Sequence, residues 1–475
     1  AIAYDSRHMS PEFADVSALC LAAKGIKAYV FESLRPTPEL SYAVRKLGAI
    51  AGINITASHN PPEYNGYKVY WEDGAQITPP HDTGIMDEVK AVKDYSDTKT
   101  MDKDAAIAAG LYQTIGADID DPYIAELKKL VIHQDAIDAV GGELKIVYTP
   151  LHGTGNIPVR RVLKELGLAT VSYPNPEAAE AFELGLALAK KVDADLILAT
   201  DPDADRLGVY VKDAKTGEYH SLTGNMSGCL IGDYIIGQKK ELTGLPADGA
   251  FVKSIVSTNM ADAIAKYYGI ELIEVLTGFK FIGQKILEFE TTGKGTYLFG
   301  MEESYGCLPG TYARDKDAVA ASMMLCEAAA YYKTKNMTLW DAMIQMYERY
   351  GYYKDEVTSI TLKGMEGLEK IQEIMNNLRA NAPKEIGGYQ VTAVRDYKND
   401  TITDTASGAV KATGLPSSNV LYYELTDDAW VCVRPSGTEP KVKFYFGIKG
   451  TSLEDADRKA SDMKEAVSAL VEGMM

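Results

Sequence analysis

The sequence predicts a fold of the α/β class: three α/β domains with mixed, largely parallel sheets, followed by a C-terminal α+β domain. Apolar runs of strand length alternate with segments of helical period along most of the chain, whereas strands cluster in its last part. A chain of 475 residues is also too long for one typical core, and its length alone predicts roughly three or four domains.

The alternation is clearest in three strand–helix–strand units, which show no residue-level repeat among themselves. Their predicted elements are strand 28–31, helix 38–47 and strand 50–55; strand 145–148, helix 159–166 and strand 196–199; and strand 251–256, helix 260–268 and strand 272–275. Such units favour parallel strands, because a crossover must return the chain before the next parallel strand begins.

The last part of the chain predicts a separate α+β domain. After a strand near residue 353, its predicted elements are helix 365–378, strands 389–394, 420–425, 430–433 and 443–448, and a final helix 453–471. Consecutive strands without intervening helices are typical of an antiparallel sheet.

Composition excludes several classes of protein. No apolar run reaches about 18 residues, so no membrane span is expected. The net charge of -18 argues against a nucleic-acid-binding protein, although local charge still allows an anionic substrate. The five cysteines form no Cys-x-x-Cys pair, and no charged-then-apolar leader opens the chain. We therefore expect reduced thiols and a cytoplasmic protein.

The loop around Ser58 is the first candidate for chemistry. Residues 56–68 are Thr-Ala-Ser-His-Asn-Pro-Pro-Glu-Tyr-Asn-Gly-Tyr-Lys, directly after the predicted strand 50–55. Ser58 offers a hydroxyl nucleophile and His59 a titratable imidazole, while the prolines and the glycine favour a fixed loop. Such a loop suits a serine that accepts and returns a phosphoryl group, although most Ser-His pairs taken alone belong to ordinary polar loops.

Three aspartates form the second candidate. Asp201, Asp203 and Asp205 alternate along a loop that follows the predicted strand 196–199. Three like charges this close repel one another unless a cation joins them, and carboxylate oxygens suit a hard ion such as Mg²⁺. The alternative is a solvated acidic turn, which the preceding apolar run disfavours. Arg206 is placed to hold a phosphate oxygen or to orient a carboxylate.

Further segments are weaker in isolation. Residues 434–441, Arg-Pro-Ser-Gly-Thr-Glu-Pro-Lys, lie between two predicted strands and suit either a phosphate cradle or a plain hairpin turn. Residues 298–306 predict a strand running into the acidic loop Glu-Glu-Ser-Tyr-Gly, whose carboxylate and hydroxyl groups suit sugar hydroxyls. Two more segments, Thr-Gly-Phe-Lys at 277–280 and Arg-Asp-Lys-Asp at 314–317, give little indication of function by themselves.

Together these segments resemble the α-D-phosphohexomutase superfamily, the phosphoglucomutase/phosphomannomutase enzymes. The resemblance covers nearly the whole chain and keeps the family order, beginning at Tyr-Asp-Ser-Arg, residues 4–7. Each motif is modest, but six or more in order are highly specific. Asn-Gly-Tyr-Lys-Val-Tyr at 65–70 and Thr-Pro-Leu-His-Gly at 149–153 look most similar to the branch of the bacterial phosphoglucomutases and the phosphoglucomutase-2 type.

The resemblance also implies residue roles. It makes Ser58 the phosphoserine and, together with the three aspartates, a ligand of Mg²⁺. It implies that Arg7, His59, Lys68 and Lys316 surround the transferring group, with His59 and Lys316 handling protons. It assigns sugar and phosphate binding to Thr277, Gly278, Lys280, Glu302, Ser304, Arg314, Arg206, Arg434, Ser436, Gly437 and Thr438.

The implied fold has four domains around a central cleft, and we place their boundaries at 1–120, 121–224, 225–352 and 353–475. In the family a Gly-Thr-x-Gly-Leu-Arg segment precedes the first motif, and we expect it upstream of Ala1. Ala318 stands where the family commonly has glycine.

The implied activity is that of a phosphosugar mutase that interconverts glucose 1-phosphate and glucose 6-phosphate through phosphoserine, with a sugar 1,6-bisphosphate as intermediate and primer. The alternatives are a phosphopentomutase or phosphomannomutase, then a Mg²⁺-dependent sugar phosphatase or a non-catalytic phosphosugar sensor. The expected partner is a small phosphosugar, with neither nucleic acid nor membrane, and the protein is expected to be a monomer or a homodimer.

Overall fold

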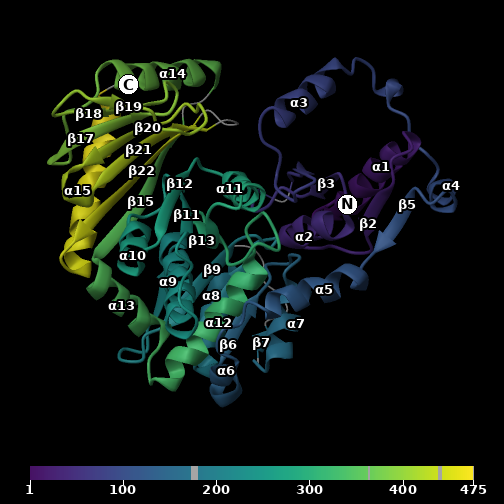
Figure 1. Ribbon diagram of the computed structural model, residues 1–475, viewed down its shortest axis with the longest axis horizontal. Coiled ribbons are helices and arrows are strands. Elements are labelled where there is room, and N and C mark those ends of the chain that lie inside the picture. The colour runs from purple at the N-terminus through teal and green to yellow at the C-terminus, as the bar shows by residue number, and fades with distance from the viewer. Residues whose placement is uncertain (62, 169, 173–179, 362–363, 437–440, 474–475) are drawn as a thin grey trace. The chain divides into compact units, whose positions relative to one another are not determined.

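The computed structural model describes residues 1–61, 63–168, 170–172, 180–361, 364–436 and 441–473 (Figure 1). The chain forms two compact units. The first comprises Ala1–Lys253, Tyr268–Ile273 and Gly278–Met343, and the second Ser254–Tyr267, Glu274–Thr277 and Ile344–Met475. No helix among the described residues is long and apolar enough to cross a membrane.

The first sheet carries the Ser58 loop. Its strands lie in the order β4 (Tyr67–Trp71), β3 (Ala51–Ile55), β1 (Ile2–Tyr4), β2 (Ala28–Phe31) and β5 (Tyr112–Ile115). All neighbours pair in parallel except β4, which runs antiparallel to β3 at the edge. A buried apolar row of Ile2, Val30 and Ile53 crosses its centre in register.

Two helices cover opposite faces of this sheet. α1 (Ser10–Ala23) connects β1 to β2, and α2 (Thr37–Leu47) connects β2 back to β3 on the other side of β1. Right-handed crossovers that run in opposite directions place their helices on opposite faces. The alanines of α1 join the core of Ile2, whereas Val44 of α2 packs where Gly52 lacks a side chain.

The segment that follows β4 carries α3 (His81–Ala91), a 3₁₀ turn (Tyr95–Asp97) and α4 (Lys103–Ala108). None of the α3 residues is buried. The structure therefore adds helices between the Ser58 loop and β5 that the apolar pattern did not predict.

The second sheet carries the aspartate loop. Its order is β10 (Tyr219–Leu222), β9 (Leu207–Lys212), β8 (Leu196–Thr200), β6 (Ile146–Thr149) and β7 (Thr170–Ser172). β6, β7 and β8 are parallel, while β9 and β10 continue the sheet antiparallel. Every residue of β8 is buried, which explains its uninterrupted apolar run. Its helices are α5 (Ala117–Lys128), α6 (Gln134–Val140), α7 (Asn156–Leu166) and α8 (Glu180–Val192).

The third sheet has the order β12 (Glu271–Val275), β11 (Gly249–Ser254), β13 (Thr296–Glu302) and β14 (Gly306–Leu308). Its helices are α9 (Gly224–Leu242), α10 (Met260–Tyr268), α11 (Phe279–Thr292), α12 (Ala318–Thr334) and α13 (Leu339–Tyr350). The predicted strand 251–256 was wrong at its end. β11 stops at Ser254 because the chain turns there, with Ser257 N–H donating to the Ser254 carbonyl.

The fourth sheet is antiparallel, as predicted for the C-terminal part. Its order is β15 (Tyr352–Thr361), β22 (Lys441–Gly450), β21 (Trp430–Pro435), β20 (Leu421–Leu425), β17 (Tyr389–Asp396), β18 (Thr401–Asp404) and β19 (Val410–Lys411), with β16 (Glu385–Ile386) beside β17. α14 (Gly364–Ala380) and α15 (Leu453–Glu472) pack on it and share one core with its strands (Figure 1). The expected α/β and α+β layers are therefore confirmed.

Candidate active site

The Ser58 loop leaves the carboxyl end of β3. Ser58 has a φ of 52°, a left-handed conformation that is uncommon for a residue with a side chain. Its backbone N–H donates to Thr56 Oγ1 at 2.9 Å, and its hydroxyl lies 3.3 Å from His59 Nδ1. Ser58 is only 8% exposed, so its hydroxyl faces the protein interior.

Arg7 holds this loop in place. Its guanidinium donates to backbone carbonyls of Ser58, Asn60, Pro61 and Tyr64, which all belong to the loop. Its Nε lies 3.3 Å from Asp5. The guanidinium thus fixes the backbone of the loop that carries Ser58, and the role of Arg7 beside the transferring group stays a prediction.

The aspartate loop leaves the carboxyl end of β8 in the same compact unit. Asp201, Asp203 and Asp205 are all buried, and each can offer one carboxylate oxygen within 4.8 Å of the others. Asp201 Oδ1 accepts the backbone N–H groups of Asp205 and Arg206, which folds the loop back on its first carboxylate.

The two loops meet at Ser58 and Asp201. The Ser58 hydroxyl donates to Asp201 Oδ2 at 2.9 Å. Two strand ends of different sheets thus bring the predicted nucleophile to the predicted metal ligands, as expected for loops at the carboxyl ends of parallel strands.

Two lysines offset the charge of the aspartates. Lys68 Nζ lies 2.8 Å from Asp203 Oδ2, and Lys316 Nζ lies 3.1 Å from Asp205 Oδ2. Burial alone would lower the pKa of Lys316, but Asp205 and its other acidic neighbours raise it well above its usual value. Both predicted lysines therefore lie beside the triad, and Lys316 carries a proton at neutral pH.

The three aspartates titrate differently. Burial, reinforced by the other two carboxylates, raises the pKa of Asp201 well above its usual value. Burial also raises the pKa of Asp205, against the opposing charge of Lys316. For Asp203, burial is outweighed by the Lys68 ammonium, which lowers the pKa of that carboxyl.

The donor set fits a divalent cation. Asp203 Oδ1 and Asp205 Oδ1 are buried and accept no hydrogen bond from the described part of the chain. Arg206 Nε lies 3.7 Å from Asp205 Oδ1, beyond hydrogen-bonding distance. Buried carboxylate oxygens without partners are costly unless an ion binds them, and hard cations prefer such ligands.

A second acidic group lies next to this cluster. Glu302, the last residue of β13, accepts a 2.7 Å hydrogen bond from the Ser304 hydroxyl and lies 3.7 Å from Lys316 Nζ. Lys316 thus connects the aspartate loop to the predicted sugar-binding pair.

A pocket of about 420 Å³ adjoins the serine and aspartate loops. Its polar lining includes His59, Asp201 and Arg206, and its apolar lining includes Leu151 and Leu222. There is room beside the nucleophile for a small ligand.

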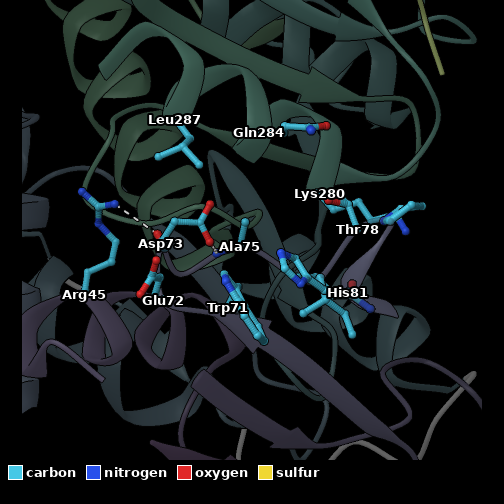
Figure 2. Close-up of a pocket in the computed structure, with 13 residues that line it drawn as sticks. Arg45, Trp71, Glu72, Asp73, Ala75, Thr78, His81, Lys280, Gln284 and Leu287 are labelled. Atoms are coloured by element: carbon cyan, nitrogen blue, oxygen red, sulfur yellow. Dashed lines mark hydrogen bonds between the residues drawn. The ribbon is translucent and has the colours of Figure 1, made fainter. Parts of the chain in front are cut away.

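Lys280 lies elsewhere, in a pocket of about 460 Å³ with Trp71, His81 and Gln284 (Figure 2). The Trp71 and His81 rings stack there with centroids 4.3 Å apart. None of the described residues that line this pocket belongs to the serine or aspartate loops. Lys280 thus lines a pocket other than the one beside Ser58, and its contact with the sugar stays a prediction.

Arg314, for which substrate binding stays a prediction, makes its contacts inside the protein. It is fully buried, lies 2.5 Å from Glu290 of α11 and donates to the Thr311 and Ala313 carbonyls. Its guanidinium braces its own loop.

The remaining predicted binding residues lie at strand ends. Thr277 and Gly278 follow β12, whereas Arg434 lies within β21 and Ser436 directly follows it. Two further predicted residues, Gly437 and Thr438, lie outside the described residues.

Sequence analysis missed several supporting residues. Thr37 donates a hydrogen bond to Asp203, and Asn54 donates one to Thr37. Neither residue belongs to a recognisable motif. Gly153 lies against the aspartate loop, where a Cβ would come within 2.6 Å of the Pro202 backbone. In the sequence, residues 149–153 indicate only a likeness to the family and not this packing role.

Four domain descriptions of one protein family match the chain in order. They are phosphoglucomutase/phosphomannomutase alpha/beta/alpha domains I, II and III, at residues 1–96, 121–217 and 223–350, and the C-terminal domain, at residues 377–466. The chain belongs to the phosphoglucomutase/phosphomannomutase family. Membership confirms the predicted superfamily and identifies the chain as a mutase of the phosphoglucomutase type.

Two curated relatives align with almost the whole length of this chain. A phosphoglucomutase of Staphylococcus aureus strain MRSA252 is 36% identical over 480 residues, spanning 97% of this chain and 84% of that protein. A phosphoglucomutase of Staphylococcus epidermidis is 35% identical over 485 residues, with 97% and 85% covered.

Solved structures share the family fold. The open form of the Paramecium exocytosis-sensitive phosphoprotein pp63/parafusin, a phosphoglucomutase, has a TM-score of 0.71 at 18% identity and covers 100% of this chain and 87% of its own. A phosphoglucomutase/phosphomannomutase family protein of Burkholderia thailandensis has a TM-score of 0.67 at 20% identity, with 99% and 89% covered.

Proposed function

We propose that this protein interconverts glucose 1-phosphate and glucose 6-phosphate through phospho-Ser58. The observation that carries the proposal is the hydrogen bond from the Ser58 hydroxyl to Asp201, inside a buried cluster of three aspartates. The curated phosphoglucomutases at 35–36% identity support glucose phosphates over other sugar phosphates.

In the first transfer, the bond between phosphorus and Ser58 Oγ breaks, and a bond forms between phosphorus and the free hydroxyl oxygen of the sugar monophosphate. The sugar hydroxyl loses its proton to a base, and Ser58 becomes an alkoxide that must gain one. We propose that His59 and Lys316 handle these protons, because His59 Nδ1 lies 3.3 Å from the Ser58 hydroxyl and Lys316 Nζ lies 3.7 Å from Glu302 of the proposed sugar-binding pair.

The resulting glucose 1,6-bisphosphate returns its other phosphoryl group to Ser58, and the same compound primes the unphosphorylated enzyme. In this second transfer the bond between phosphorus and the sugar oxygen breaks and the bond to Ser58 Oγ forms again, so no phosphate is lost. The sugar must bind in two orientations, and we propose that Glu302 and Ser304 hold its hydroxyls in both.

The three aspartates and phospho-Ser58 would hold a divalent cation, which we propose is Mg²⁺. When bound, Mg²⁺ would neutralise phosphate charge and stabilise the transferring group electrostatically. We further propose that Arg206 binds an oxygen of the transferring phosphate and that Arg434, Ser436, Gly437 and Thr438 bind the phosphate that does not react.

Intact-protein mass spectrometry tests this assignment. After incubation with glucose 1,6-bisphosphate, the wild type should gain the mass of one phosphoryl group, and Ser58→Ala should gain none and lose mutase turnover. Ser17→Ala, which removes a hydroxyl that donates to the Phe13 carbonyl of its own helix, is the matched control and should behave like the wild type. Turnover by Ser58→Ala would refute the nucleophile assignment.

A substrate panel separates the alternatives. Glucose, mannose and ribose 1-phosphates assayed with the bisphosphate primer should show the highest kcat/KM for the glucose compound. Release of inorganic phosphate without isomer formation would indicate a phosphatase instead.

A further inference from the structure

Asp203 is held by a hydrogen-bonded chain that begins in the first sheet. Thr37, the first residue of α2, donates through Oγ1 to Asp203 Oδ2 at 2.9 Å, and its backbone N–H donates to the Asp203 carbonyl oxygen at 2.9 Å. Thr37 and Asp203 are both 0% exposed. A side chain 166 positions earlier in the sequence thus fixes both the carboxylate and the backbone of a metal-ligand candidate.

Asn54 determines which way the Thr37 hydroxyl points. Its Nδ2 donates to Thr37 Oγ1 at 2.7 Å, and Asn54 is itself fully buried in β3. A hydroxyl has one proton, so Thr37 accepts from Asn54 and gives its proton to Asp203. In the opposite amide orientation, Asn54 Oδ1 and Asp203 Oδ2 would compete for the single proton of the Thr37 hydroxyl.

The same pair of strands supplies the other donor. Asn54 lies directly opposite Lys68 in the β3–β4 pairing, so both side chains project from one face of the sheet. Lys68 Nζ donates to Asp203 Oδ2 at 2.8 Å. Two donors therefore converge on one oxygen of Asp203.

The other oxygen is left without a partner. Asp203 Oδ1 is buried and accepts no hydrogen bond from the described residues. Because Oδ2 is saturated by Thr37 and Lys68, the carboxylate cannot rotate to exchange its oxygens without breaking both bonds. The arrangement presents Oδ1 in a single orientation.

We propose that Thr37 and Asn54 are positioning residues of the metal site, which hold Asp203 so that Oδ1 binds the cation. The inference rests on the proposed metal role of the three aspartates but not on the identity of the sugar substrate. Partners that orient a ligating group set metal affinity as well as the ligands' geometry. A buried hydrogen-bonded network with a purely structural role would change folding stability and leave metal affinity unaltered.

Mn²⁺ binding measured by electron paramagnetic resonance, with substrate absent, tests the proposal. Thr37→Val keeps the shape of the side chain but removes the hydroxyl, and we expect its dissociation constant for Mn²⁺ to rise about 10- to 100-fold. Thr37→Ser restores the donor and should stay within about 3-fold of the wild type. Asn54→Asp places an acceptor where the donor was, draws the Thr37 proton away from Asp203 and should also weaken binding.

Ser322→Ala is the control for loss of a buried hydroxyl. Ser322 is 0% exposed and donates only to the Ala318 carbonyl within α12, so its variant should bind Mn²⁺ like the wild type. Wild-type affinity in both Thr37→Val and Asn54→Asp would overturn the proposal, as would equal weakening in Ser322→Ala. If Thr37→Val does not fold, the comparison of Asn54→Asp with Thr37→Ser still tests the proposal. Asn54→Asp should lose affinity for Mn²⁺, and Thr37→Ser should keep it. The Mn²⁺ measurement does not depend on turnover. If the protein showed no mutase activity, the binding comparison would still test the role of Thr37 and Asn54.

Discussion

Lys316 is confined by Gly306, ten residues before it in the chain. A Cβ built on Gly306 would overlap Cδ of Lys316, and the next atoms of the lysine side chain also lie within contact distance. The ammonium of the same lysine is fixed 3.1 Å from Asp205. The glycine at the start of β14 therefore leaves the space in which this lysine reaches the aspartate loop.

Replacing Gly306 should displace Lys316. We expect Gly306→Ala to lower kcat/KM on the order of 10- to 100-fold, because small misplacements of a catalytic group have effects of this size. Gly84→Ala in α3 is the matched control, since nothing lies within 4 Å of a Cβ there. Steady-state kinetics and thermal unfolding of both variants check the result, and unchanged kinetics in Gly306→Ala would show that Lys316 can shift at no cost.

Replacing Arg7 should loosen the serine loop. Arg7→Lys keeps the positive charge but cannot reproduce the several donors that reach the carbonyls of residues 58, 60, 61 and 64. We expect kcat to fall by about 100-fold while the mass of the phosphorylated form still appears slowly. The measurement is the rate of phosphoryl uptake from glucose 1,6-bisphosphate, together with proteolysis near Tyr64. Wild-type rates would contradict a positioning role.

Removing divalent cations should abolish turnover and lower thermal stability. Chelation leaves buried Asp203 Oδ1 and Asp205 Oδ1 without partners, and Mg²⁺ at 100 times its dissociation constant should stabilise the fold by about 2.7 kcal/mol. Unfolding scans with and without Mg²⁺ check this. Asp203→Asn should lose the shift, and a shift retained in that variant would place the ion elsewhere.

The titration of buried Glu39 should make the stability of the fold depend on pH. This residue is 2% exposed, and burial followed by Asp120 raises the pKa of its carboxyl well above the usual value. In the unfolded chain a glutamate titrates near about pH 4.3. Between that pH and the folded pKa, the folded chain holds the extra proton, so the free energy of unfolding falls as pH rises, by up to about 1.4 kcal/mol per unit.

Glu39→Gln removes this titration and keeps a donor for Asp120. The difference in unfolding free energy between the variant and the wild type should therefore grow in favour of the variant as pH rises above the unfolded-chain value of about 4.3. Urea unfolding at several pH values measures it, with exposed Glu12→Gln as the control. Parallel pH profiles for Glu39→Gln and the wild type would contradict the assignment.

The sequence predicted those parts of the site that follow from local pattern. The run 196–199 is apolar because β8 is buried throughout, and three carboxylates directly after such a strand have few non-metal explanations. Ser58 was predicted by the same logic at the end of β3. The three domain boundaries placed after residues 120, 224 and 352 stay a prediction.

Directions of side chains were not predictable. Arg7 and Arg314 occur in segments that the family resemblance assigns to substrate, and both also donate hydrogen bonds to backbone carbonyls of the folded loops, which their place in the sequence does not indicate. Thr37 carried no signal, because its contact with Asp203 depends on how the two sheets pack. Its surroundings, Pro-Thr-Pro, indicate only the start of a helix.

The contact between Ser58 and Asp201 spans 143 positions of the chain. During synthesis the serine emerges long before any of the aspartates, so a nascent or truncated chain has the nucleophile without its counterpart. Covalent modification of this serine would thus report that both sheets have formed and docked. In a cell extract, each molecule phosphorylated at Ser58 would therefore be one in which the two loops have met.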